Sequence, residues 1–334
     1  NFAEFLQRRP KDQPFCFWFG SSDPHRPYKW RSGVESGLDP DRIRVPGHLP
    51  DTETVRLDLA DYYFEVERFD REVGEALELL ARTGELDNTI IVMTGDNGMP
   101  FPRSKSNLYD AGTHVPLVVC WRSGAPGGRA VTDFVSLADF APTFLEAAGL
   151  PVPECMTGRS LLDLLRRNGN GRLDPARDHV LTGKERHVPA QEAGNTGGYP
   201  CRAIRTDRFL YIRNFKPERW PAGVRTNAER GGPFADCDGS PTKTWMIEHE
   251  KDPGVKRLFD LAFAKRPAEE LYDLKWDPDQ LVNVADRPGY AAVKRELADR
   301  LMRELQATGD PRAFGRGDWF DHYPYYGGPA RRRR

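Results

Sequence analysis

The sequence predicts an α/β protein with a mostly parallel sheet flanked by helices, followed by a smaller C-terminal α+β part with an antiparallel sheet and a packing helix. Two observations predict the first part. A long amphipathic pattern at 52–83 separates apolar runs at 14–20 and 90–94, and this order is typical of a strand–helix–strand crossover in a parallel sheet. One observation predicts the second part: beyond about residue 195, short alternating segments replace the crossover pattern.

The composition bounds the kind of molecule. The chain has 334 residues, of which 38% are hydrophobic and 30% charged, and its formal net charge is −1. Near neutrality argues against a general nucleic-acid binder, and no apolar run approaches the roughly 20 residues of a membrane span. The five cysteines form no Cys-x-x-Cys pair, so neither a zinc cluster nor a dense disulfide framework is indicated. Cys16 and Cys120 stand in apolar runs and are predicted to lie in the core.

The first elements follow from local patterns. Residues 14–20 form a continuous apolar run bounded by Pro and Gly, which predicts a strand buried on both faces. Apolar residues recur every three or four positions from 52 to 83, and Gly84 provides a stop signal, so a long amphipathic helix is expected there. The run at 90–94 then predicts the strand that follows the crossover.

The later elements are read in the same way. They are a strand at 115–121, a helix at 136–148 with Pro142 as a possible kink, a short helix at 161–165, a strand from Val180 towards His187, a hairpin at 201–213 turning at Thr206-Asp207, an irregular stretch at 216–257, a strand at 270–274 and an amphipathic helix at 290–308. The strand from Val180 is expected to be the last of the first part.

Polar side chains follow the strand at 90–94. Asp96 and Asn97 offer hard oxygen donors of the kind that suits Ca²⁺ or Mg²⁺, and Lys105 in the next loop could place a point charge on an anionic substrate. Gly95-Asp-Asn-Gly98 is equally ordinary turn chemistry, and a loop lysine is commonly solvated. Taken alone, these residues leave a metal-and-anion site and a plain turn both open.

Two further groups are candidates for the site. His25 and Arg26 lie in a proline-flanked loop after the first apolar run, where open α/β sheets commonly bind ligands. His25 could donate a proton to a leaving group or simply bond to loop backbone. Lys184 and His187 bound a charged cluster that would recognise a sulfated or carboxylated sugar, or form a solvated turn.

Several segments, in a fixed order, resemble the sulfatases, and most nearly the heparan N-sulfatase (sulfamidase) branch. They are Asp23-Pro-His-Arg26, Pro50-Asp-Thr52, the long helix, Gly95-Asp-Asn-Gly-Met-Pro-Phe-Pro102 and Asn107-Leu-Tyr109, with Arg202-Ala-Ile-Arg-Thr-Asp207 and Glu270-Leu-Tyr-Asp-Leu274 as a weaker continuation. The resemblance implies the alkaline-phosphatase-like α/β fold. Residues 1–195 would be part of its catalytic domain and residues 196–334 its C-terminal α+β subdomain.

The resemblance also implies roles for individual residues. Asp96 and Asn97 would be two of four protein ligands of one catalytic Ca²⁺ ion, Lys105 would bind the sulfate group, and His25 would lie near the scissile sulfate and its leaving group. Sulfamidase carries Arg where this chain has Lys105, which leaves N-sulfate and O-sulfate substrates both open. The other substrate-binding candidates are Arg26, Lys184 and His187.

One part of the family pattern is missing. The family's nucleophile is formylglycine, made from the Cys or Ser of a Cys/Ser-x-Pro-x-Arg motif that opens a helix, and an Asp-Asp pair lies upstream; neither stands before His25. Ser22-Asp-Pro-His-Arg26 has the spacing but leads into Pro27 rather than a helix. Since the chain also begins at Asn1 without a targeting signal, we expect it to be the C-terminal portion of a longer sulfatase and inactive by itself.

The expected activity of the full-length protein is formylglycine- and Ca²⁺-dependent hydrolysis of sulfate esters or sulfamates on sugars such as heparan-type glycans. By resemblance its location would be periplasmic, secreted or lysosomal, and a homo-oligomer is left open. One alternative is a phosphohydrolase or phosphodiesterase of the same superfamily, although such enzymes usually gather several Asp and His ligands for two metals. The other is a non-catalytic pseudoenzyme that binds sulfated glycans.

Overall fold

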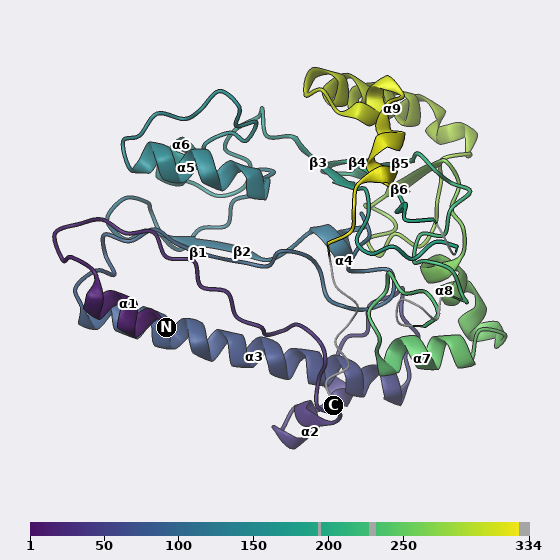
Figure 1. Ribbon diagram of the computed structural model, residues 1–334, viewed down its shortest axis with the longest axis horizontal. Coiled ribbons are helices and arrows are strands. Elements are labelled where there is room, and N and C mark those ends of the chain that lie inside the picture. The colour runs from purple at the N-terminus through teal and green to yellow at the C-terminus, as the bar shows by residue number, and fades with distance from the viewer. Residues whose placement is uncertain (193–194, 227–231, 327–334) are drawn as a thin grey trace. The chain divides into compact units, whose positions relative to one another are not determined.

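The computed structural model describes residues 1–192, 195–226 and 232–326 (Figure 1). Its internal contacts divide the chain into two compact units. Unit 1 comprises residues 1–45, 51–92 and 118–127, and unit 2 comprises the remainder of the chain. The domain boundary expected between residues 195 and 196 stays a prediction.

A 30-residue helix, α3 (Glu53–Arg82), is the main element of unit 1 and confirms the predicted long helix. It begins after Thr52, whose hydroxyl accepts a hydrogen bond from the Val55 amide. Its apolar stripe packs against α2 (Ser32–Glu35). At this contact, a Cβ atom on Gly33 would lie only 2.3 Å from the carbonyl oxygen of Ala60, so the close approach requires glycine.

The predicted buried strand at 14–20 is wrong. The segment is extended but belongs to neither sheet of the described chain, and Trp18 is 91% exposed. An extended segment becomes a strand only through ladder hydrogen bonds to a neighbour. Here alternate rings, Phe15 and Phe17, instead pack on Phe5 of α1 (Phe2–Arg8).

The cysteines also differ from expectation. Cys16 and Cys120 are exposed rather than in the core, because the apolar runs that contain them are not covered on both faces. All five cysteines are free thiols, so no pair of them forms a disulfide.

The strands β1 (Ile91–Thr94) and β2 (Leu117–Cys120) confirm two predicted strands and form a two-stranded sheet. Within the described residues, this pair and the four-stranded sheet below are the two sheets. The wide parallel sheet that the sequence predicts is therefore not confirmed, because the strand expected at 14–20 pairs with neither.

Unit 2 contains a four-stranded antiparallel sheet in the order β3–β4–β5–β6. The strands are β3 (His179–Lys184), β4 (Cys201–Thr206), β5 (Phe209–Asn214) and β6 (Glu269–Asp273). The predicted hairpin is confirmed as β4–β5. The strand near Val180 was expected to end the first part; instead it pairs antiparallel with β4, from His179 opposite Thr206 to Lys184 opposite Cys201.

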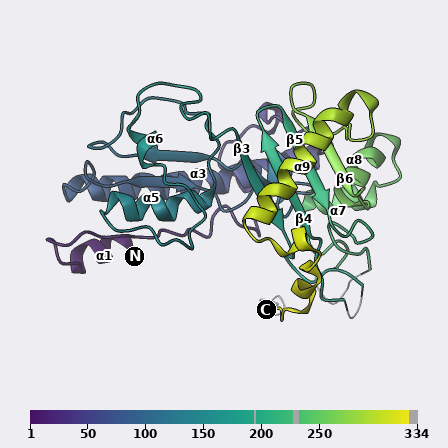
Figure 2. The ribbon, with the colours of Figure 1, turned by 90° about the horizontal axis from the view of Figure 1, so that it is seen from above.

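The sheet buries both of its faces. On one face Cys201, Ala203 and Leu210 pack with Tyr109 and Tyr272. On the other face lies α9 (Ala291–Ala307), the predicted C-terminal helix, which crosses the sheet diagonally in Figure 2. Its residues Leu297, Leu301 and Leu305 recur every four positions and pack against Ile204 and Tyr211.

Within the described residues, the other helical elements of unit 2 are shorter than α9. They are α4 (Asp110–Thr113), η2 (Leu137–Asp139), α5 (Phe140–Ala147), α6 (Leu162–Arg166), α7 (Pro241–Glu248), α8 (Pro253–Phe263), η4 (Pro288–Tyr290), η5 (Pro311–Phe314) and η6 (Gly317–His322). Pro142 is the third residue of α5, where its missing amide breaks no helical hydrogen bond, so the helix needs no kink. The sequence reading missed α7 and α8.

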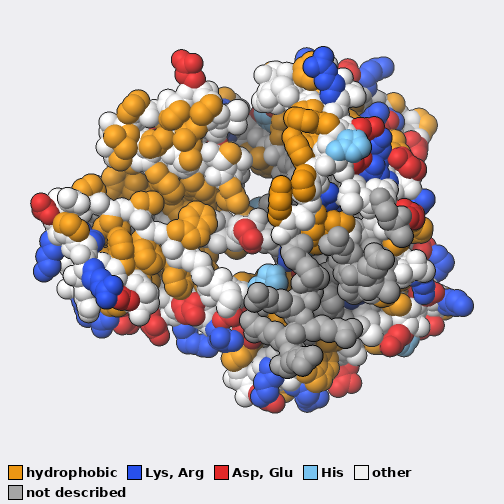
Figure 3. Space-filling view, in the orientation of Figure 1, with side chains coloured by type: hydrophobic (Ala, Val, Ile, Leu, Met, Phe, Trp, Pro, Cys, Tyr) orange, Lys and Arg blue, Asp and Glu red, His pale blue; other side chains and the backbone are white. Residues whose placement is uncertain are grey.

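Apolar side chains gather over the α5–α6 segment in the space-filling view (Figure 3). The large exposed ones there are Leu137, Phe144, Leu150 and Val152. As for membranes, none of the helices in the described part of the chain has the length and apolar character needed to cross one.

Packing of α9 on the sheet provides a stability test. Leu301 is fully buried, so Leu301→Ala should lower the free energy of unfolding by about 3 kcal/mol through lost burial and a residual cavity. Glu296→Ala, on the exposed side of the same helix, should change it by less than about 0.5 kcal/mol. Urea denaturation followed by circular dichroism measures both, and equal effects would show that α9 is not packed as described.

Candidate functional site

The loop after β1 presents Asp96 and Asn97 to solvent at the carboxyl end of the strand. Gly98 holds this loop against α4: its amide donates to the Gly112 carbonyl at 2.9 Å, and a Cβ atom on Gly98 would lie 1.9 Å from the Ala111 carbonyl oxygen. A larger residue at position 98 would push the loop away from α4. The two oxygen-bearing side chains are thus placed by backbone contacts of their neighbours.

The loop that carries Lys105 is fixed on both sides. The flanking residues Arg103 and Ser106 have left-handed backbone conformations, with φ of 64° and 65°. The buried imidazole of His48 lies 3.1 Å from the Ser104 hydroxyl, and burial lowers the His48 pKa to about 3, so this ring is neutral. The Asn107 side-chain amide donates to the Lys105 carbonyl at 2.9 Å.

Buried cations tie the same loop to the core of unit 2. The Arg103 guanidinium donates to the carbonyls of Leu261 and Gln280, each at 2.7 Å, and lies over the ring of Tyr109. Arg266 donates to the Asn107 side-chain oxygen at 2.7 Å. The backbone position of Lys105 is therefore set by several independent contacts.

Two aspartates separated by one residue hold the predicted cations. The Lys105 ammonium lies 3.0 Å from Asp238 Oδ2, and the Lys184 ammonium lies 2.8 Å from Asp236 Oδ2. The other Asp236 oxygen accepts the Val188 amide at 3.1 Å. Burial would raise the pKa of Asp236, but Lys184 and His187 outweigh it and hold that pKa below its usual value.

His187 completes this cluster. Its Nδ1 atom lies 3.2 Å from Asp236 Oδ1, within ion-pair distance, although the ring does not meet hydrogen-bond geometry there. Interaction with the Asp236 carboxylate raises the pKa of His187, while burial and the Lys105 ammonium oppose the rise. About a third of the His187 side chain remains exposed, so the imidazole can contact a ligand from solvent.

The turn that carries both aspartates is built around a buried lysine. Lys243 on α7 is 5% exposed, and its ammonium donates to the carbonyls of Phe234 and Cys237 at 2.9 and 2.7 Å. Burial lowers the pKa of Lys243. The turn therefore keeps Asp236 and Asp238 in place through backbone contacts, independently of the cations that they bind.

His25 and Arg26 belong to unit 1. The His25 side chain is exposed, and its Nδ1 lies 2.6 Å from the Arg26 carbonyl oxygen. The Arg26 guanidinium makes two hydrogen bonds to the Asp58 carboxylate on α3, at 2.8 and 2.9 Å, and both side chains are buried. Arg26 thus anchors the loop that presents His25.

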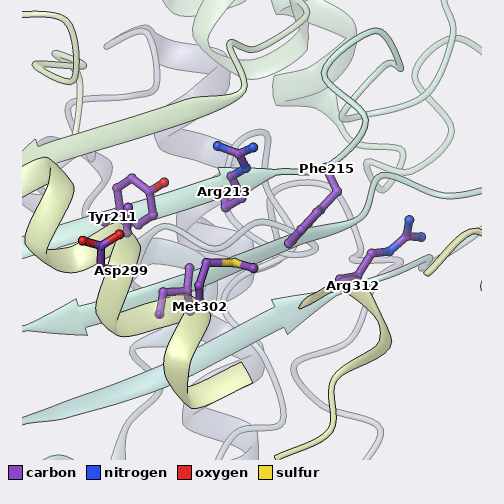
Figure 4. Close-up of a pocket in the computed structure, with 8 residues that line it drawn as sticks. Tyr211, Arg213, Phe215, Asp299, Met302 and Arg312 are labelled. Carbon is purple, nitrogen blue, oxygen red and sulfur yellow. The ribbon is translucent and has the colours of Figure 1, made fainter. Parts of the chain in front are cut away.

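A cavity of about 390 Å³ lies between α9 and β5 and contains none of the predicted site residues (Figure 4). The Tyr211 hydroxyl donates to Glu269, and Arg312 pairs with Glu185 and Asp318. Because these polar groups already have partners, we assign no function to the cavity.

Comparison with known proteins decides the family. The sulfatase family model matches residues 1–150, and the model described as N-sulphoglucosamine sulphohydrolase, C-terminal, matches residues 103–221. The chain is 30% identical to the human N-sulphoglucosamine sulphohydrolase over 340 residues, which covers 92% of this chain and 63% of that protein. The chain belongs to the sulfatase family.

Other relatives agree with this sulfatase assignment. An ulvan-active sulfatase of Formosa agariphila is 30% identical over 270 residues, covering 80% of this chain and 41% of that protein. The chain thus spans about half the length of the curated sulfatases it matches. It does not include a counterpart of every part of those proteins.

Solved structures show the fold. One, from work on glycosaminoglycan metabolism by Bacteroides thetaiotaomicron, matches with a TM-score of 0.65 at 18% identity, covering 97% of this chain and 61% of that one. A protein in complex with its substrate D-glucosamine-2-N,6-O-disulfate matches at 0.55 and 23% identity, covering 78% and 42%. A phosphonate monoester hydrolase of Agrobacterium radiobacter matches at 0.52 and 23% identity, covering 77% and 42%.

In this sulfatase chain the structure brings Lys105, Lys184 and His187 together around Asp236 and Asp238. The sequence reading missed both aspartates and Lys243, because they fall in the stretch taken as irregular. A signal was present: Ser240-Pro241 is a typical helix start, with Ser as N-cap and Pro at the first helical position. Recognition of this helix start would have shown that Asp236 and Asp238 come directly before a helix.

The raised pKa of His187 gives a pH test. Because the folded-state pKa exceeds the usual value of about 6.5, protonated His187 stabilises the fold; this contribution is fully present below about pH 6.5 and is lost as the pH rises through the folded-state pKa. Titration followed by NMR should place the His187 pKa above the usual histidine value of about 6.5. The stability advantage of the wild type over His187→Gln should shrink with rising pH, and an advantage that grows would contradict the assignment.

Proposed function

We propose that this chain serves the hydrolysis of a sulfate ester or sulfamate on a sugar, and that Lys105 binds the sulfate group. The observation that supports this most directly is the meeting of Lys105, Lys184 and His187 within one unit of a sulfatase-family chain. Sulfate oxygens accept hydrogen bonds from charged N–H donors. A relative named for N-sulphoglucosamine and a neighbour bound to a disulfated glucosamine favour a sulfated glucosamine as the substrate class.

Each candidate residue of the proposed site would have a distinct role. The Lys105 ammonium would neutralise charge on the sulfate oxygens, most strongly as that charge grows in the transition state. His187, when protonated, would add a second donor, with Lys184 held beside it by Asp236. His25, whose Nδ1 faces the Arg26 carbonyl, would present Nε2 to the leaving group. Arg26 would act by holding that loop through Asp58.

Asp96 and Asn97 are the right type of donor for Ca²⁺, but they are too few to hold the ion by themselves. Asp96 and Asn97 offer two exposed hard oxygens, whereas Ca²⁺ takes about 6–8. In the three described stretches, no group of three or more His, Cys, Asp and Glu side chains could hold a metal ion. We propose these two residues as ligands of an ion that would polarise the sulfate oxygens.

A formylglycine nucleophile does not fit the residues of this chain. Cys201, followed by Ala203 and Arg205, comes nearest to the motif spacing, but it lies in β4, where burial raises its pKa to about 11. The loop at 22–26 leads into an irregular segment and not into a helix. We therefore assign no step of the reaction to that group.

The sulfate-binding proposal is tested by Lys105→Met. The variant should bind glucosamine N-sulfate about 10- to 100-fold more weakly than the wild type, because a charge-assisted hydrogen bond is lost. Isothermal titration calorimetry at low salt measures the affinity. Lys256→Met, an exposed lysine that pairs with Asp260 on α8, is the matched control and should bind normally.

Three results would contradict the proposal or redirect it. Unchanged binding by Lys105→Met would remove Lys105 from the site. Tighter binding of a phosphate monoester than of the matching sulfate ester would favour the phosphohydrolase alternative. Hydrolysis of 4-nitrophenyl sulfate by the purified chain would exclude a purely binding role and show that its nucleophile lies among its own residues.

The metal assignment has its own test. With two protein ligands the purified chain should bind Ca²⁺ only weakly, with a dissociation constant of about 1 mM or more. Asp96→Ala should weaken this binding severalfold, as measured by competition with Tb³⁺ luminescence, whereas Asp163→Ala, an exposed acid on α6, should not. Equal Ca²⁺ binding by Asp96→Ala and the wild type would remove Asp96 from the ligand set.

A further inference from the structure

Asp238 poses a problem for a sulfate site. Its carboxylate lies 3.0 Å from the Lys105 ammonium, the group that the proposed function assigns to sulfate. A carboxylate beside that cation repels an anionic ligand and reduces the net charge that the ligand meets. We therefore expect the Asp238 carboxylate either to bind another part of the ligand favourably or to stabilise the fold.

The fold does not account for Asp238 in the way it accounts for Asp236. Asp236 is buried and uses both oxygens on Lys184, His187 and the Val188 amide. Asp238 is about a quarter exposed, and within the part of the chain that the structure describes its side chain makes one contact, through Oδ2 to the Lys105 ammonium. The turn itself is held through its backbone carbonyls by Lys243.

The arrangement at the exposed rim is a donor beside an acceptor. Lys105 has three N–H donors and spends one on Asp238, which leaves donors for a sulfate oxygen. An ionised carboxylate only accepts hydrogen bonds and has about four lone-pair sites, so Asp238 can bind Lys105 and a ligand hydroxyl together. A ligand that fits both groups carries an anion and a hydroxyl on neighbouring atoms.

We propose that Asp238 is a specificity-determining residue that accepts a hydrogen bond from a sugar hydroxyl adjacent to the sulfated position. This inference rests on the proposed role of Lys105 in sulfate binding. It narrows the substrate class to sulfated sugars with a free hydroxyl next to the sulfate-bearing carbon. A second sulfate at that neighbouring position would face the carboxylate and be rejected by like-charge repulsion.

The test compares two sulfamates that differ in hydroxyl groups. Glucosamine N-sulfate carries a free 3-hydroxyl beside its sulfamate, whereas N-cyclohexylsulfamate carries none. Asp238→Asn should weaken binding of glucosamine N-sulfate about tenfold or more. The same variant should bind N-cyclohexylsulfamate as well as the wild type or more tightly, because a repulsive charge is gone. Asp163→Asn on α6 is the matched control and should change neither affinity.

A measurement on the wild type keeps the test independent of the variant's folding. The methyl glycoside of glucosamine N-sulfate has its 3-hydroxyl as the one free hydroxyl next to the sulfamate-bearing carbon, and its 3-deoxy analogue should bind the wild type about tenfold more weakly than this parent glycoside. Equal binding of these two sugars, or a shift of both sulfamates in the same direction in Asp238→Asn, would overturn the role of Asp238 alone. A wild type that binds no sulfamate at all would overturn the proposed function itself.

Discussion

The buried carboxylate of Asp236 is the interaction on which the C-terminal unit's cluster depends. It joins the end of β3, through Lys184, to the segment that follows, through His187 and the Val188 amide. Without it, the Lys184 ammonium and the protonatable His187 imidazole would lie in a partly buried place without the carboxylate that contacts both of them, which is unfavourable. The turn that carries Asp236 is held by the Lys243 ammonium. The buried Lys243 therefore positions the carboxylate that contacts Lys184 and His187.

The spacing of apolar residues correctly predicted the elements whose hydrogen bonds join residues close together in the sequence. The helix α3 and the hairpin β4–β5 are of this kind, since both carry a continuous period of their own. The run at 14–20 has the composition of a strand but pairs with no strand in the described residues. The strand β3 pairs antiparallel with β4, which begins 17 positions after β3 ends, and not within a parallel sheet. Pairing is a long-range property that a single window of sequence does not contain.

The site divides in the same way. Lys105, Lys184 and His187 were candidates because charged residues stand near predicted strand ends, and that placement is local. Asp236 and Asp238 were missed because their significance lies in what they contact, 52 and 133 residues away along the chain. The match to a phosphonate hydrolase of similar fold shows that fold does not choose between sulfur and phosphorus.

The fixed loop around Lys105 has a consequence for how the site would open and close. Arg103 connects this loop to the carbonyls of Leu261 and Gln280, and Arg266 connects it to Asn107. The loop therefore cannot detach without exposing buried guanidinium groups, so its motions are coupled to unfolding of the surrounding core rather than to local fluctuation. The loop that carries Lys105 would therefore lose little backbone entropy when a ligand binds. We expect its backbone to have the same conformation in the free and the bound protein.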